Sequence, residues 1–127
     1  MKNYKEYIEY CQRLAEDIND SYSDDIDLND RIHEIADGCQ YVIYYSKAWD
    51  LVNMMQWSNR ELWEKATQEA GRWCTYENEN EIEAYMSELA YYLIRNGIYS
   101  AYQNIESEVA AGNVGKMAMS FTKNINH

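Results

Sequence analysis

The chain of 127 residues contains no proline and only five glycines. Proline breaks helices and glycine weakens them, so their scarcity favours long, uninterrupted helices. Apolar residues make up 46% of the chain, which is enough to form a core in one domain of this length. We therefore expect a single compact all-α domain of about four to six helices at residues 1–111 and a flexible C-terminal tail at 112–127.

Apolar residues at three- and four-residue steps predict the individual helices. The first helix is expected at residues 4–18, where the apolar face consists of Tyr4, Tyr7, Ile8, Cys11, Leu14, Ala15 and Ile18. A second helix begins near Asp27, and its apolar face consists of Leu28, Ile32, Ile35, Cys39 and Val42. Gly38 either weakens this helix or ends it, so that a new one begins.

Residues 41–56 are predicted to be helical, although the sequence YVIYY has the propensity of a strand. Ser58 and Glu61 match a capping box, which predicts a helix from Ser58 to about Ala70. Asn80 is predicted to cap a long helix that ends towards Val109 and is either straight or bent at Asn96-Gly97. Residues 20–26 and 71–78 are expected to be loops.

The three cysteines, Cys11, Cys39 and Cys74, form no CxxC pair and are expected to be free thiols in a reducing cytoplasm. The chain has neither a basic-then-apolar leader nor the roughly 20-residue apolar run of a membrane span. The sequence thus predicts a soluble intracellular protein without membrane contact.

The charge is strongly negative and unevenly distributed. The chain has 22 acidic and 11 basic residues, a net charge of −11, which excludes binding of a phosphate backbone as its main activity. Residues 16–37 contain nine acidic residues against Arg31 alone. Residues 77–88 contain no basic residue and five glutamates: Glu77, Glu79, Glu81, Glu83 and Glu88.

Four of these acids, Asp27, Asp30, Glu34 and Asp37, follow one another at steps of three and four residues. They share a helix face that is directed away from the apolar face, and like charges at these spacings destabilise a helix by roughly 0.2–0.5 kcal/mol per pair. The face is either an ordinary solvated surface or a row of carboxylates for a basic partner. Because a helix rises about 1.5 Å per residue and duplex DNA carries one charge per roughly 1.7 Å, such rows can approximate phosphates.

The run from Asp27 to Asp37 (DLNDRIHEIAD), with Tyr22–Ile26 (YSDDI) before it and Tyr44-Tyr45 after it, resembles the Ocr-like antirestriction proteins of phages. The resemblance covers about residues 4–51. It implies an all-helical homodimer whose carboxylates imitate bent B-form DNA and occupy the DNA groove of type I restriction-modification enzymes. The carboxylates carried over by this resemblance are Asp24, Asp25, Asp27, Asp30 and Asp37.

Few residues could support catalysis or hold a cofactor. His33 to Asp37 (HEIAD) has an aspartate where the HExxH zinc motif has its second histidine, and the other histidine of the chain is His127. His33 is expected either to bind a metal weakly or, as a polar helix residue, to form a local hydrogen bond. The sequence contains no catalytic triad, phosphate loop or nucleotide fingerprint, so we expect no enzyme, no cofactor and no metal.

The chain also contains thirteen tyrosines and four tryptophans, more aromatic side chains than a small helical core easily buries. Some of them are expected in the core and others at an interface between subunits or with a partner. The candidate interface residues are Trp49, Met54, Met55 and Trp57.

These features predict a phage-encoded inhibitor of a host defence system that acts in the cytoplasm of the infected cell. It would mimic duplex DNA in the basic DNA-binding groove of a type I restriction-modification or similar enzyme, without binding nucleic acid itself. The candidate carboxylates are Asp24, Asp25, Asp27, Asp30, Glu34, Asp37, Glu77, Glu79, Glu81 and Glu83. The main alternative is a helical interaction module that binds a host or phage protein through its Trp/Met/Tyr surface; an enzyme of unrecognised type is a third.

Overall fold

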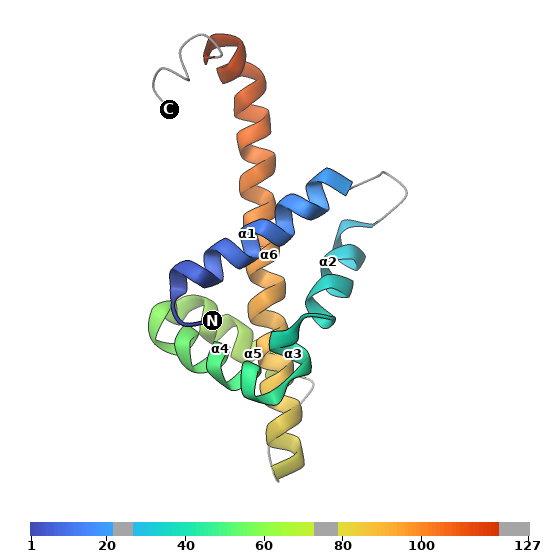
Figure 1. Cartoon of the computed structure of the whole chain (residues 1–127), viewed down its shortest axis with the longest axis vertical. Coiled ribbons are helices and arrows are strands. Elements are labelled where there is room, and N and C mark those ends of the chain that lie inside the picture. Colours follow the sequence, from blue (N-terminus) through green and yellow to red (C-terminus); the bar gives the residue numbers. More distant parts are fainter. Residues whose placement is uncertain (22–26, 73–78, 120–127) are drawn as a thin grey trace.

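The computed structural model describes the backbone of residues 1–21, 27–72 and 79–119 and the side chains of these residues up to Glu106, except those of Glu79 and Asn80. This part of the chain forms six helices and no strand. The last helix, α6 (Glu79–Met119), is the central element, and each of the five preceding helices contacts it (Figure 1). The prediction of a single all-α body is confirmed.

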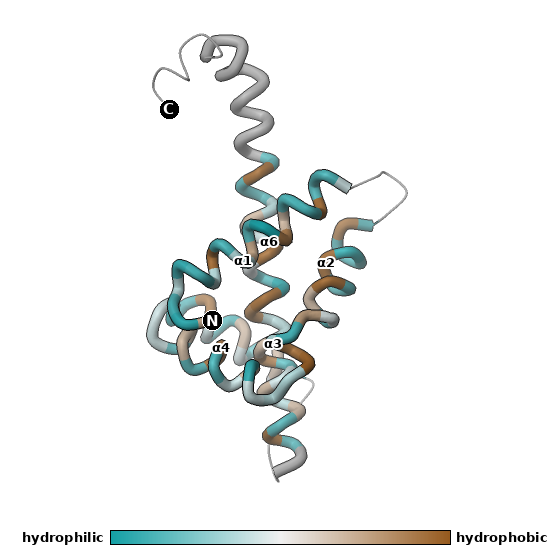
Figure 2. Tube along the Cα trace, in the orientation of Figure 1, coloured by the Kyte–Doolittle hydropathy of each residue, from teal (hydrophilic) through white to brown (hydrophobic). Residues whose placement is uncertain are grey.

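The first helix, α1 (Tyr4–Ser21), crosses α6 with the face that the apolar spacing predicts. Its buried residues are Tyr7, Cys11, Ala15 and Ile18. Ile8 was expected on the same face but is 42% exposed. Figure 2 shows that α1 is largely hydrophilic outside this stripe, whereas apolar residues recur along the middle part of α6, which the other helices flank. Burial against α6 therefore supplies most of the hydrophobic stabilisation of α1.

The second helix, α2 (Leu28–Asp37), ends at Gly38. The backbone N–H of Gly38 donates to the carbonyls of Glu34 and Ala36, which closes the helix, and a short helix, α3 (Gln40–Ile43), follows. The sequence left open whether Gly38 weakens the helix or ends it. In the structure, the helix ends there and a new one begins. Ile32, Ala36, Cys39 and Val42 are buried, in agreement with the predicted apolar face.

The prediction of one helix over residues 41–56 is wrong, because the helix is interrupted at Tyr44. Tyr44 has extended backbone (φ −100°, ψ 121°) and separates α3 from α4 (Tyr45–Ser58). The β-branched and aromatic residues of this segment favour a helix only weakly, so the local break costs little. It leaves the Val42 carbonyl without a helical partner, and Ser87 on α6 donates its hydroxyl to that oxygen at 2.5 Å.

The helix after α4 is capped by Asn59 and not, as predicted, by Ser58, which is the last residue of α4. The Asn59 side-chain oxygen accepts from the backbone N–H of Leu62 at 3.1 Å, and its amide donates to the Tyr4 hydroxyl at 3.0 Å. Asn59 thus starts α5 (Arg60–Gly71) and also joins it to α1. This second contact explains why asparagine acts as the cap here.

Helix α6 differs from its predicted bounds at both ends. It begins at Glu79, so Asn80 lies within the helix and is not its N-cap, and its backbone stays helical to Met119, beyond the predicted end near Val109. It is also continuous through Asn96 and Gly97, where the sequence left a bend open. Helix α1 continues to Ser21 and α5 to Gly71, so both extend into the loops predicted at residues 20–26 and 71–78. Residues 22–26 and 73–78 of these loops, and residues 120–127 of the predicted tail, lie outside the described residues.

Gly97 marks the closest approach of α1 to α6. A Cβ built on Gly97 would lie 2.5 Å from the Cys11 sulfur and still closer to the Tyr7 hydroxyl. Both residues are buried, and the Tyr7 hydroxyl donates to the Leu93 carbonyl at 2.5 Å. Burial raises the pKa of the Cys11 thiol to about 12, so this thiol stays protonated in the core.

We predict that Gly97→Ala lowers the free energy of unfolding by about 2 kcal/mol or more, because overpacking exceeds the gain of roughly 1 kcal/mol in helix propensity. Urea denaturation followed by circular dichroism measures the change. Gly71→Ala is the matched control, since a Cβ on Gly71 meets no atom within 4 Å, and it should not destabilise the protein. Equal stability of the two variants would contradict this account of the crossing.

Candidate functional site

The acidic residues that begin with Asp27 form an exposed row on the outer face of α2. Asp27, Asp30, Glu34 and Asp37 are all exposed, whereas Ile32 and Ala36 on the opposite face are buried against the core. We call these four residues the α2 acidic row. The predicted outward orientation of this row is confirmed. The buried face of α2 therefore fixes the direction in which the four carboxylates point.

Asp27 at the start of the row also has a structural role. Its carboxylate accepts from the backbone N–H groups of Asn29 at 2.8 Å and Asp30 at 3.3 Å, so Asp27 is the N-cap of α2. A negative charge at a helix N-terminus also interacts favourably with the helix dipole. Asp27 is therefore less available to a partner than the other three carboxylates.

We predict that Asp27→Ala lowers the free energy of unfolding by about 1 kcal/mol through loss of the cap. Asp27→Asn should retain most of the stability, since asparagine caps a helix about as well as aspartate while removing the charge. Thermal denaturation of both variants measures their stability and distinguishes the contribution of the capping hydrogen bonds from that of the negative charge. If both lose stability equally, the charge of Asp27 and not its hydrogen bonds stabilises α2.

Little positive charge opposes the row. Arg31 is the basic residue of α2, and its guanidinium lies 3.4 Å from the Glu34 carboxylate in a largely exposed pair. An exposed pair of this kind contributes no more than about 1 kcal/mol and is screened by salt. The row therefore keeps most of its negative charge at its surface.

Helix α6 adds a polar edge beside α2. His33 and Tyr91 are joined by a hydrogen bond of 2.5 Å between Nδ1 and the tyrosine hydroxyl, with their rings edge to face. Of the two roles expected for His33, local hydrogen bonding is therefore the one observed. Among the described residues, no group of three His, Cys, Asp or Glu side chains could hold a metal ion.

Glu88 extends the acidic surface from α2 onto α6. Its pKa is raised, mainly because the carboxyl is partly desolvated and also because Asp37 is nearby, while His33 acts in the opposite direction. The sequence placed Glu88 in an acidic segment but did not single it out. Its position next to Asp37 depends on the packing of α2 against α6, which sequence spacing does not show.

We predict that Glu88→Gln makes the protein more stable than the native chain at pH 7. The raised pKa means that the folded state favours protonated Glu88, so this stabilisation is lost as the pH rises through the folded-state pKa. Below the ordinary pKa of a glutamate the two proteins should be equally stable. Urea midpoints at several pH values test this, with the exposed Glu83→Gln on the same helix as control. A variant less stable than the native chain at pH 7 would refute it.

The structure describes the side chains of only two of the remaining candidate carboxylates, Glu81 and Glu83. Glu83 is exposed on α6 and Glu81 is half-buried. Glu79 begins α6, but its side chain lies outside the described residues, as do Asp24, Asp25 and Glu77 altogether. In the structure, Glu88 thus lies beside the α2 acidic row.

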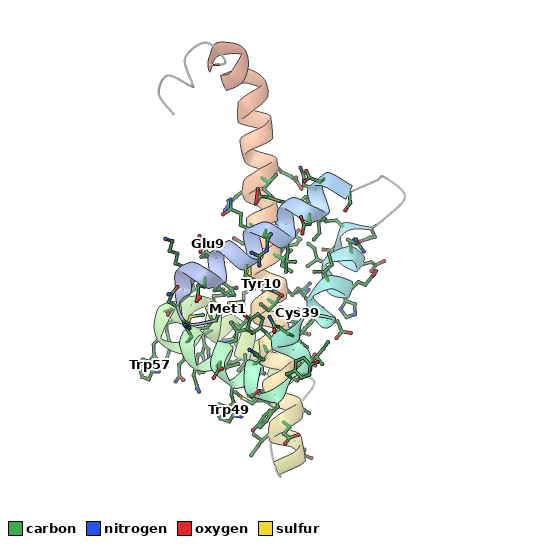
Figure 3. All side chains as sticks on the ribbon, viewed as in Figure 1. Met1, Glu9, Tyr10, Cys39, Trp49 and Trp57 are labelled. Carbon is green, nitrogen blue, oxygen red and sulfur yellow. The ribbon has the colours of Figure 1, made fainter. Side chains whose placement is uncertain are left out.

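A second exposed surface consists of aromatic residues on α4 and of Tyr44, which lies between α3 and α4. Trp57 is 81% exposed, Tyr44 59%, Tyr45 38% and Trp49 37%. We call these four residues the aromatic surface. Figure 3 shows Trp49 and Trp57 projecting from the body into solvent, and the rings of Tyr45 and Trp49 contact edge to face at 6.1 Å. Exposed tryptophans of this kind are typical of interfaces.

The two methionines of α4, Met54 and Met55, are not exposed as Trp49 and Trp57 are. Met55 is completely buried in the core, so its prediction as an interface residue is wrong, and Met54 is partly buried against the core. The reason is helical geometry, since the face of α4 that carries Ala48, Leu51 and Met55 packs on the body. Of the other tryptophans, Trp63 is partly buried, and Trp73 lies outside the described residues.

Comparison with known proteins found no matching family model, no similar curated protein and no similar solved structure. Within the described part of the chain, no helix combines the length and apolar character needed to cross a membrane.

Proposed function

We propose that this protein inhibits a DNA-binding enzyme by presenting the α2 acidic row in place of DNA phosphates. The observation that carries the proposal is the exposure of all four carboxylates along one helix face. The position of Glu88 beside Asp37 supports it, because it widens the row across the edge of α6.

The spacing of the row is compatible with such mimicry. At a rise of about 1.5 Å per residue, the ten steps from Asp27 to Asp37 span roughly 15 Å. One strand of DNA carries a phosphate about every 3.4 Å along the axis, so the same length holds four or five phosphates. Four carboxylates therefore come close to the charge of one strand over this distance.

The net charge of −11 adds long-range attraction to a positively charged groove. The target class we propose is a type I restriction-modification enzyme or a similar defence enzyme in the cytoplasm of an infected host cell. The resemblance to Ocr-like antirestriction proteins supports this target and a homodimeric inhibitor. The proposal assigns no catalysis, no cofactor and no direct binding of nucleic acid.

A competition experiment tests this function. The DNA-binding core of a type I enzyme is loaded with labelled duplex, and displacement by the protein is followed at two salt concentrations. We predict displacement near stoichiometric protein that weakens at high salt. Asp30, Glu34 and Asp37 changed together to lysine should raise the concentration needed by about 10-fold or more.

The matched control changes three exposed acids outside the row, Glu9, Asp17 and Asp50, to lysine. Both variants have a net charge of −5, so a difference between them reports the position of the charges. Circular dichroism verifies that both are folded. Full inhibition by the α2 variant would exclude the α2 acidic row as the active surface.

The aromatic surface favours a second candidate function, that of an interaction module for a specific host or phage protein. Trp57 at 81% exposure is a large apolar side chain whose burial by a partner would be favourable. Such binding should tolerate high salt and be lost with Trp57→Ala, whereas the lysine substitutions in α2 should leave it unchanged. The same two sets of variants thus distinguish the candidates.

A further inference from the structure

A groove of about 590 Å³ lies between α1, α5 and α6, away from both surfaces described above. Apolar side chains line it from all three helices: Ile8 from α1, Leu62 from α5, and Tyr99 and Ile105 from α6. Ile8 and Tyr99 are 42% and 39% exposed, so the groove leaves apolar surface in contact with water. Burial of this surface would be favourable.

The groove carries no net charge, unlike the acidic surface of α2. Its lining contains one acidic and one basic residue, Glu61 and Lys65, and the other polar residues that line it are neutral. Two copies of a chain with a net charge of −11 repel each other over most of their surfaces. A contact between copies is therefore least unfavourable where the surface is neutral, as it is in this groove.

The α6 helix supplies an occupant of matching length. Residues 96–105 of α6 contribute to the groove, and the helix then continues for fourteen residues to Met119. Figure 1 shows α6 continuing past its crossing with α1 and away from the other helices. Most of the stability of a helix in a protein comes from packing, so a partner that packs against this part of α6 would stabilise it.

The sequence of this part of α6 suits a closely packed, uncharged contact. Residues 108–117 (EVAAGNVGKM) contain one acid and one base and are otherwise uncharged. Four of the ten are alanine or glycine, residue types that are compatible with a close approach of two helix backbones, and three others are the apolar Val109, Val114 and Met117.

We infer that the groove receives the C-terminal part of α6 from a second copy of this chain. A twofold axis between residues 106 and 107 of two antiparallel α6 helices places residues 96–105 of one copy opposite residues 108–117 of the other. Both grooves are then filled reciprocally, as an isologous interface requires. This inference specifies the homodimer proposed above and rests on that part of the proposed function; it is independent of the α2 acidic row.

Analytical ultracentrifugation of the full chain over a range of concentrations tests the inference. We expect a dimer whose dissociation constant rises by about 10-fold or more with Ile8→Glu, because the substitution places two charges in each dimer interface. Ile43→Glu is the matched control, since Ile43 is 58% exposed and lies on α3, outside the groove. It should leave the dissociation constant unchanged.

Crosslinking tests the antiparallel register. Ser100→Cys combined with Asn113→Cys should give covalent dimers with a short bismaleimide, because the proposed register places these residues opposite each other. Within one chain the two positions are about 20 Å apart along the helix, so the product joins two chains. Ser100→Cys alone gives the background from the native cysteines.

Two results would overturn the inference: a protein that stays monomeric at all concentrations, and a dimer that is unaffected by Ile8→Glu or weakened equally by Ile43→Glu. DNA displacement measured on Ile8→Glu keeps the two proposals separate. If a monomeric Ile8→Glu variant still displaces DNA in a salt-sensitive manner, the α2 acidic row is supported as the inhibitory surface, whether or not the protein dimerises.

Discussion

The crossing of α1 and α6 at Gly97 is the contact on which the rest of the structure depends. Because Gly97 has no side chain, Tyr7 and Cys11 pack directly on the backbone of α6, and the Tyr7 hydroxyl reaches the Leu93 carbonyl. The remaining helices then complete a core around the same central helix. A single close approach thus sets where α1 lies and, with it, one wall of the groove.

The acidic row is displayed at a cost that the fold offsets. Carboxylates three and four residues apart on α2 repel each other, and Arg31 neutralises only part of this charge. The Asp27 cap and the burial of Ile32 and Ala36 hold the helix together in spite of this repulsion. A surface that is unfavourable for the isolated helix is therefore maintained by packing on the opposite face.

The sequence predicted those features that depend on local periodicity. The buried stripe of α1 and the outward direction of the α2 acidic row follow from helical spacing alone. It did not predict the break at Tyr44, the dual role of Asn59 or the groove, because each depends on residues distant in the chain. Ser87 satisfies the Val42 carbonyl and Tyr4 accepts from Asn59, and neither pairing has a signal in sequence spacing.

The central helix follows the other five in chain order, which has a consequence for biosynthesis. Each of the five earlier helices contacts α6, so none of them can complete its packing before α6 has been translated. Domains often begin to fold while still attached to the ribosome, starting from the N-terminus. Here the five earlier helices emerge without their main partner, and the cooperative core forms only after α6 has been translated.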